Sequence, residues 1–545
     1  EFAAIWQIST THESQAVMAE SPDDLVKGVQ RLAGENYRPQ SISVGVGGGS
    51  AVWACIASRP IVADVDKERL GKRKANAAVA LLRLERDATV WGVLKHSPDP
   101  RSRSHLIHRF RPYRVPVDVL IQRLAAERDV SVRRALIQAI GDASETTVSK
   151  DDQDRFIQNL QYMYKHDADA GIHASIRWLL SRWLSPDENR RLDSELSPAD
   201  YSSDKGWFIN SQAQTFSIVN GPVAFVMGSP PTETGREGGP YGNFETPHHR
   251  LIDYSFAVQS TLVTINEFLR FRPDFTYRQI YAPDERCPIN QVTFYDAAAY
   301  CNWLSCQEGI PEDQWAYYPN ENGEYAEGMV IPGDFLSKAG YRLPLESEYE
   351  YVCRAGARTS RFYGETGELD EHYSWVAKTS HCRSAIPVGT LKPNDLGLFD
   401  VLGNVMQWCH LQSYKEPFAV NRLSDVQNCK RVKDTDKVAG RGAHFCVPEP
   451  STRSAYLSRF APNFHLFAVG FRLSKTINLP VGGAGEQEIV TNTTGFPWRG
   501  ANFIHHSNQV RSSYRPDYRA NIFTFGNGFR LARTVAQPDT SRQEE

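Results

Sequence analysis

The chain has 545 residues, of which 41% are hydrophobic and 23% are charged, and its formal net charge at pH 7 is −3. A chain of this length exceeds what one hydrophobic core supports, so we expect three or four structural units. The balanced charge excludes the strongly basic surface that nucleic-acid binding needs, and the apolar runs fall far short of the ~20 residues of a membrane-spanning helix. We therefore expect no nucleic-acid partner and no membrane insertion.

Nine cysteines are scattered along the chain, and none of them is spaced as C-x-x-C. The odd count and the irregular spacing argue against a zinc ribbon and against a disulfide scaffold. Mostly free thiols are typical of a reducing compartment, so we expect a cytoplasmic location. The chain opens on "EFAAIWQIST", without an initiator Met or a signal pattern, and we interpret it as a piece of a longer polypeptide or a processed product.

Residues 1–62 are expected to form a small β unit. The segment "YRPQSISVGVGGGSAVWACIA" indicates a strand, a glycine turn and a second strand, because Ile42 and Val44 alternate with polar residues before three glycines. No G-K-[ST] follows these glycines, so we prefer a hairpin to a phosphate-binding loop. The opening "FAAIWQ" is similar to "SAVWACI", which indicates a truncated repeat of the same unit.

Residues 67–195 carry apolar residues at i, i+3, i+4 and i+7, the spacing of amphipathic helices. A weak repeat recurs at 99–110, 129–141 and 167–180, and each copy places an Asp ahead of a helix, where it can cap exposed N–H groups. This pattern resembles HEAT-type helical repeats, which bury a continuous core and offer a surface to protein partners. We therefore expect a helical scaffold that binds a protein.

Three histidines lie in this helical segment, and we interpret them as solvated or capping residues rather than metal ligands: His105, His108 and His173. The polar, Ser- and Asp-rich residues 196–206 are expected to form a linker. From Trp207 onward the chain has short strands, many glycines and prolines, and two clear helical stretches at 295–307 and 346–356.

Six short motifs follow one another along the chain between residues 225 and 473. They are "FVMGS" (225–229), "ETPHHR" (245–250), "PINQVTFYDAAAYCNWLS" (288–305), "GYRLPLESEYEYVCRAG" (340–356), "PNDLGLFDVLGNVMQWC" (393–409) and "RSAY…GFRL" (453–473). Together they resemble the formylglycine-generating enzyme (sulfatase-modifying factor) family over roughly residues 207–536. The resemblance implies a C-type-lectin-like fold with little regular structure, so the expected fold class of the whole chain is multidomain α+β.

The helical stretch followed by this domain also resembles C-terminal regions of large bacterial signalling proteins, many of them Ser/Thr kinases. The chain itself contains neither H-R-D-L nor D-F-G, so it carries no kinase motif.

The enzymes of this family hold copper(I) between two cysteines spaced C-x-x-x-x-C and activate oxygen against a substrate cysteine. Cys446 occupies the first position, but the second position is Ser451. Copper(I) is soft, and one thiolate with a hard hydroxyl does not match two thiolates. We therefore expect no copper site and interpret Cys446 as a half-buried lone thiol; should the chain be an enzyme, Cys446 is its candidate catalytic residue.

The calcium positions of the family also depart from its pattern. "YSWVAK" has Ser374 where members have Asn, and "GNVMQW" has Gln407 where members have Glu. Losing a carboxylate weakens a hard-cation site. Asn404 remains the one candidate calcium ligand, and its alternative role is that of a turn residue beside Gly403. We expect no cofactor other than calcium at this residue.

The segment 441–476 recurs without a gap as 499–534. The two copies share glycines, arginines and phenylalanines, whereas Cys446 is replaced by Ile504 and the intervening positions differ and are rich in aromatic residues. A fixed framework with divergent aromatic positions suits a recognition surface. The second copy resembles the terminal variable region of retroelement-diversified proteins, which implies these candidate contacts: His505, His506, Tyr514, Tyr518, Ile522, Phe523, Thr524 and Phe525.

The alternative for the second copy is a structural duplication whose aromatic residues belong to a core. Residues 537–545 are expected to be a polar tail. Three functions stay open. The leading one is a non-catalytic recognition or regulatory module with a protein partner. The second is a copper-dependent oxidase that relies on Cys446, and the third is an inert assembly module of a larger signalling protein.

Overall fold

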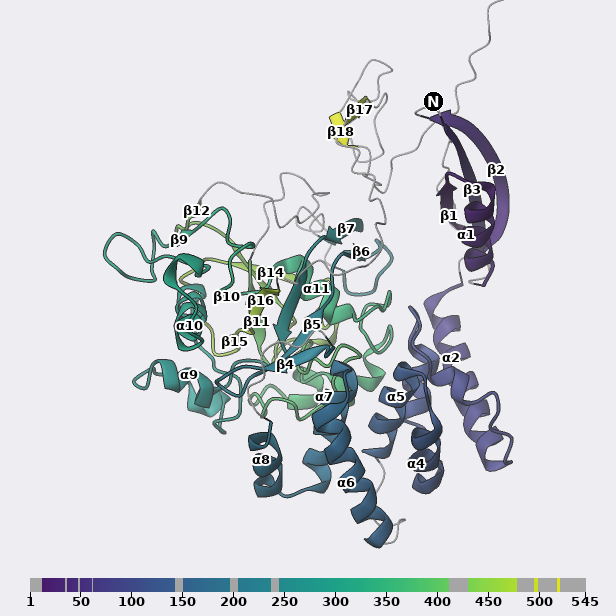
Figure 1. The fold of residues 1–545 in the computed structure, drawn as a ribbon, viewed down its shortest axis with the longest axis horizontal. Helices are drawn as coiled ribbons and strands as arrows, with labels where there is room; N and C mark the ends of the chain where they lie inside the picture. The colour runs from purple at the N-terminus through teal and green to yellow at the C-terminus, as the bar shows by residue number, and fades with distance from the viewer. Residues whose placement is uncertain are drawn as a thin grey trace, which may run out of the picture. The chain divides into compact units, whose positions relative to one another are not determined.

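The computed structural model describes residues 12–34, 37–47, 50–60, 62–142, 150–196, 204–236, 245–410 and 430–477, together with the short strands 495–497 and 517–519. The chain divides into two compact units, one of Glu1–Lys67 with Ile489–Glu545 and one of Glu68–Glu488. The described residues form helices and several small sheets (Figure 1), which confirms the α+β class. No helix in these described ranges is both long and apolar enough to cross a membrane.

The first unit contains one helix and a three-stranded antiparallel sheet in the order β1-β3-β2. Its elements are β1 (His12–Ala19), α1 (Pro22–Gly34), β2 (Arg38–Gly47) and β3 (Ser50–Pro60). The β2–β3 pair confirms the predicted hairpin. Helix α1 lies close to the sheet, since a Cβ at Gly28 would be 2.4 Å from Val17 Cγ1. The short strands β17 (Gly495–Pro497) and β18 (Asp517–Arg519) pair with each other.

A succession of helices confirms the helical character of residues 67–195. They are α2 (Asp64–Arg83), η1 (Trp91–Leu94), α3 (Arg101–Ile107), α4 (Val117–Ala126), α5 (Val130–Ile140), α6 (Lys150–His166), α7 (Ala170–Trp183) and α8 (Pro186–Ser194). Asp129 caps α5 by accepting the N–H of Val132, and Asp169 caps α7 by accepting that of Ile172. The predicted caps are thus present at these two helices. The assignment to HEAT-type repeats stays a prediction.

The rest of the second unit has little regular structure. One sheet has the order β10-β16-β8-β5-β4 and a second has the order β14-β13-β11-β15. The strands are β4 (Trp207–Ile209), β5 (Thr215–Val219), β6 (Val223–Met227), β7 (His248–Ile252), β8 (Ser255–Gln259), β9 (Val330–Ile331), β10 (Tyr341–Arg342), β11 (Met406–Cys409), β12 (Lys430–Arg431), β13 (Val438–Arg441), β14 (Leu457–Phe460), β15 (Val469–Gly470) and β16 (Ser474–Ile477). Strands β6 and β7 pair with each other, as do β9 and β12.

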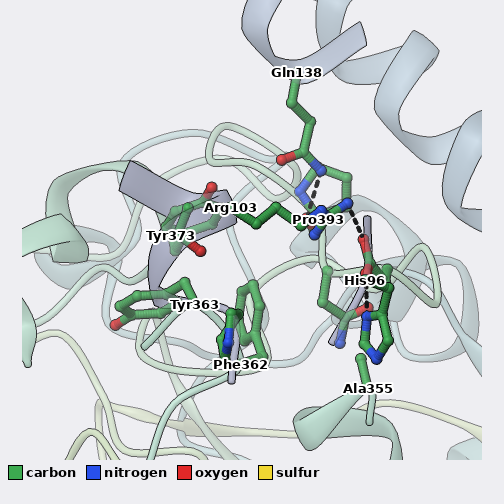
Figure 2. Close-up of a pocket in the computed structure, with 12 residues that line it drawn as sticks. His96, Arg103, Gln138, Ala355, Phe362, Tyr363, Tyr373 and Pro393 are labelled. Atoms are coloured by element: carbon green, nitrogen blue, oxygen red, sulfur yellow. Dashed lines mark hydrogen bonds and ion pairs between the residues drawn. The ribbon is translucent and has the colours of Figure 1, made fainter. Parts of the chain in front are cut away.

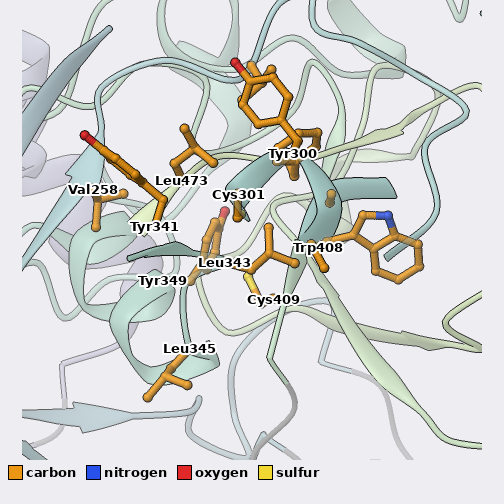
Figure 3. Close-up of a cluster of buried hydrophobic side chains, with 14 of the residues drawn as sticks. Val258, Tyr300, Cys301, Tyr341, Leu343, Leu345, Tyr349, Trp408, Cys409 and Leu473 are labelled. Carbon is orange, nitrogen blue, oxygen red and sulfur yellow. The ribbon is translucent and has the colours of Figure 1, made fainter. Parts of the chain in front are cut away.

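Two longer helices pack against these sheets, and both were predicted. The helices of this region are α9 (Ile265–Phe271), α10 (Phe294–Gln307), α11 (Glu346–Arg354), α12 (Asp370–Tyr373) and α13 (Ala377–Ser380), with short 3-10 turns η4 (Gln279–Tyr281), η5 (Glu312–Gln314), η6 (Gly367–Leu369) and η7 (Glu449–Ser451). Figure 3 shows part of the core between α10, α11 and the strands, where Trp408 and Tyr349 are buried. Trp408 Nε1 donates to the carbonyl of Val292 at 3.0 Å, so even the largest buried ring is hydrogen-bonded.

Buried arginines hold the irregular loops together. Four of the largest fully buried side chains are Arg342, Arg441, Arg453 and Arg472. Arg342 forms a two-pronged ion pair with Glu348 at 2.6 and 2.7 Å, and Arg453 pairs with Glu233 and Glu245. Arg441 donates to the carbonyl of Ala455 at 3.0 Å and Arg472 to that of Phe399 at 2.7 Å, so buried arginines also satisfy loop carbonyls that have no helix partner. This buried polar frame fixes the loops on which the candidate site lies.

Within the second unit, the helices pack directly on the loop-rich domain that extends from Trp207 to Ile477. Phe399, from the loop before β11, belongs to the same hydrophobic cluster as the helices. Asp395 accepts hydrogen bonds from Arg103 Nη2 at 2.9 Å and His96 Nδ1 at 2.8 Å, which are drawn as dashed lines in Figure 2. At the end of the predicted linker, Trp207 Nε1 donates to the carbonyl of Asp167. The polar composition of residues 196–206 predicts that residues 67–195 fold as a unit separable from 207–536, and this stays a prediction.

Candidate functional site

Two left-handed turns place the loop that carries Cys446. After β13 the chain passes through Gly442 at φ +92°, and a Cβ there would be 2.5 Å from Tyr349 Oη, so only glycine fits. The second turn runs through Gly403 at φ +89° and Asn404 at φ +60°, as the sequence predicts. Phe445 N–H donates to the Asn404 carbonyl at 2.9 Å and joins the two loops.

Cys446 is half-buried, as expected. It packs at the edge of an apolar cluster that is formed by Leu262, Ala385, Val405, Phe445 and Ala468. Burial, and then the neighbouring thiol of Cys382, raises the pKa of Cys446 to about 11, so the thiol is protonated at neutral pH. A protonated thiol is neither a nucleophile nor a metal ligand until it loses its proton.

The expectation of a lone thiol is wrong, because Ser380 is hydrogen-bonded to both the Cys382 turn and the Cys446 loop and so brings a second thiol close to Cys446. Cys382 is exposed and follows α13 in a turn fixed by Ser380, whose Oγ accepts from Cys382 N–H at 2.9 Å and donates to the Phe445 carbonyl. Sequence reasoning missed Cys382 because no spacing connects it with Cys446. The pairing results from the fold alone.

Ser451, at the family's second cysteine position, ends the short turn η7. Its N–H donates to the Pro448 carbonyl at 3.0 Å, and Arg361 Nη2 donates to the Glu449 carbonyl at 3.1 Å. The family's copper(I) would need a second thiolate here. The donor set of Cys446 with Ser451 does not fit that metal, since a hydroxyl is a hard ligand.

Asn404 and Gln407, which stand at positions where the family resemblance implies calcium ligands, belong to the buried polar frame. The Asn404 side chain accepts from Ile386 N–H at 3.1 Å and donates to the Ile386 carbonyl at 3.0 Å. Gln407 donates to the Asp400 carbonyl and accepts from Arg472 Nε at 2.6 Å. Both amides thus hold neighbouring loops in place. Calcium binding at Asn404 stays a prediction.

Two further polar clusters lie among the described residues. Glu68, His105 and Glu368 have ligand atoms within 4.8 Å of one another, but Arg101 and Lys72 already pair with these carboxylates and supply the positive charge that a metal would bring. A cavity of about 20 Å³ between the helices and the domain is lined by residues that include His96, Arg103, Tyr363 and Tyr373 (Figure 2). It has room for one water molecule.

The predicted recognition contacts fall mostly outside the described residues. Tyr518 lies in β18, opposite Phe496 of β17. The other seven lie outside the described residues: His505, His506, Tyr514, Ile522, Phe523, Thr524 and Phe525. Their role as contacts stays a prediction.

Two known proteins are similar in sequence to parts of this chain. The chain is 31% identical over 148 residues to the chaperone protein LppX of Paenibacillus barcinonensis, covering 23% of this chain and 52% of that protein. It is 24% identical over 258 residues to the formylglycine-generating enzyme of Mycobacterium tuberculosis, covering 40% and 84%. The chain thus spans about half the length of the first of these relatives and most of the second.

Among solved structures, Treponema denticola variable protein 1 aligns with a TM-score of 0.39 and 20% identity, covering 48% of this chain and 95% of that one. PvdO from Pseudomonas aeruginosa aligns with a TM-score of 0.37 and 21% identity, covering 50% and 98%. The family model of the sulfatase-modifying factor enzyme 1-like domain matches residues 209–477. This match and the motif series together identify residues 209–477 as a sulfatase-modifying factor enzyme 1-like domain.

Proposed function

We propose that this domain is a non-catalytic recognition module, a rigid frame that presents loops to a protein ligand. The observation that carries the proposal is the loss of the family's second thiol, since Ser451 stands in its place. The thiol that remains, Cys446, has a pKa raised to about 11, chiefly by its partial burial, which leaves it protonated at neutral pH. A reaction that needs a thiolate at both position 446 and position 451 therefore lacks the second one.

The way the polar motif residues are used supports the same proposal. Asn404 and Gln407 are hydrogen-bonded to backbone and to Arg472, where they stiffen loops. A stiff frame with irregular loops suits binding, because little conformational entropy is lost when a ligand docks. On this proposal the ligand is a protein in the cytoplasm. The helices provide a scaffold and the aromatic residues of 499–534 provide contacts.

A variant pair tests this binding role. Replacing Tyr518 and Phe523 by Ala in the full chain should abolish capture of a specific partner from lysate, while the melting temperature stays within the range of a surface change. Tyr113→Ala is the matched control, because Tyr113 is an exposed tyrosine (44%) of the helical segment. A large drop in melting temperature for the double variant would favour the structural duplication and count against recognition by these residues.

A second candidate function rests on Cys382. Its position beside Cys446 gives the domain two thiols, the soft donor set that copper(I) prefers, and thereby favours the copper-dependent oxidase of the family. Copper(I) titration separates the two candidates. One tightly bound copper that is lost in Cys382→Ser supports the oxidase, whereas no tight binding in the wild type supports the recognition module.

A further inference from the structure

Cys382 and Cys446 are free thiols on two segments that lie far apart in the sequence. The backbones of both segments are hydrogen-bonded to the same hydroxyl group. Ser380 Oγ accepts from the N–H of Cys382 at 2.9 Å and donates to the carbonyl of Phe445, the residue that precedes Cys446. Ser380 is 2% exposed, so this link is shielded from water. A single buried side chain therefore fixes the backbone on both sides of the thiol pair.

A second hydrogen bond joins the same two segments. Ala377 N–H donates to the carbonyl of Val447 at 3.1 Å, so the residues on either side of Cys446 are both tied to the α13 segment. The pKa of Cys446 is consistent with this arrangement, because the neighbouring Cys382 thiol is among the causes that raise it. The two backbone links therefore hold the segments that carry the two cysteines side by side.

The turn that carries Cys382 is strained. His381 and Cys382 have φ of +52° and +55°, two consecutive left-handed residues, neither of which is glycine. Such conformations persist only where the surroundings hold them, and they cluster at functional sites. Here Ser380 holds the turn, and the result is an exposed sulfur beside a half-buried one.

We propose that Cys382 and Cys446 form a thiol–disulfide exchange site whose co-substrate is a small-molecule disulfide. The exposed Cys382 thiolate attacks one sulfur of the disulfide R–S–S–R, which forms Cys382–S–S–R and releases one R–S⁻. Cys446 then loses its proton and attacks the Cys382 sulfur, which forms the protein disulfide and releases the second R–S⁻. Two protons leave the protein thiols, the pair loses two electrons, and the small disulfide is reduced to two thiols.

The protein disulfide would join the α13 turn covalently to the loop after β13. It would also remove both sulfurs from any metal or substrate, so the oxidised form would be inert even if the reduced form bound a soft metal. The inference does not depend on the recognition role, because it requires only that the two sulfurs can reach each other.

Disulfide mapping of the full chain tests the exchange. The protein is incubated with glutathione disulfide, free thiols are blocked, and the peptides that contain Cys306, Cys382 and Cys446 are analysed by mass spectrometry. Cys306 is the internal control, because it is an exposed free thiol at the end of α10. We expect Cys306 to keep a glutathione adduct and Cys382 to be cross-linked to Cys446, with at least tenfold more cross-link than adduct on Cys382.

Variants sharpen the result. In Cys446→Ser, Cys382 should keep the adduct as Cys306 does, because no second thiol displaces it. In Cys382→Ser, the half-buried Cys446 should stay mostly unmodified. A wild-type protein in which Cys382 and Cys306 keep equal adducts and no cross-link forms would overturn the proposal, and this comparison needs no variant to fold.

Discussion

Replacing Asp395 by Ala should be strongly destabilising, because its carboxylate joins the helices to the domain. Asp395 accepts from Arg103 and His96, and its side chain is 9% exposed. Burial by itself would raise the pKa of Asp395, but Arg103 and His96 hold it well below its usual range, so the carboxylate is charged. Removing one partner of a buried ion pair costs about 3–5 kcal/mol, and we expect a loss of that size.

The control for this change is Asp334→Ala. Asp334 is half exposed and lies 3.8 Å from Lys338 Nζ, so its loss should change the free energy of unfolding by less than about 0.5 kcal/mol. Urea unfolding followed by tryptophan fluorescence measures both variants. If Asp395→Ala stayed within 0.5 kcal/mol of the wild type, the contact between helices and domain would not contribute to stability, and the predicted separability of residues 67–195 would gain support.

Three further outcomes are expected. Burial lowers the pKa of His173 to about 3, so between pH 6.5 and 3 the unfolded chain binds a proton that the folded chain does not. As the pH is lowered through this range, the free energy of unfolding should decrease by about 1.4 kcal/mol per pH unit. Urea midpoints that do not change between pH 7 and 5 would contradict this. Gly171→Ala should destabilise by about 1–3 kcal/mol, because the new Cβ would lie 2.4 Å from the Asp395 carbonyl oxygen, whereas Gly92→Ala meets nothing within 4 Å and should be neutral in the same urea assay. Ser451→Cys should gain copper(I) affinity, and a titration with no gain would show that η7 does not bring residue 451 to Cys446.

Local patterns in the sequence predicted much of the fold. The helices α10 and α11 and the β2–β3 hairpin follow from spacing and turn residues, and Asp129 and Asp169 cap helices as their positions indicate. These features depend on neighbours within a few residues, which a single sequence displays. The left-handed turn at Gly403 and Asn404 likewise follows from residues that tolerate a positive φ.

Contacts between distant segments could not be predicted. His105 and His173 were expected to be solvated or capping, but both are buried, and His173 stacks against Trp207 from beyond the predicted linker. Cys382 and Cys446 meet only because Ser380 joins two loops. Nothing in the spacing of these residues encodes such a meeting, since it depends on how the whole domain closes.

The most direct test of the recognition proposal is oxygen consumption by the copper(I)-treated full chain with a cysteine-containing peptide, with Cys446→Ala as the matched control. The proposal predicts equal oxygen uptake for the two proteins and no aldehyde in the peptide. Uptake and aldehyde formation by the wild type that Cys446→Ala abolishes would contradict it and establish the domain as an oxidase.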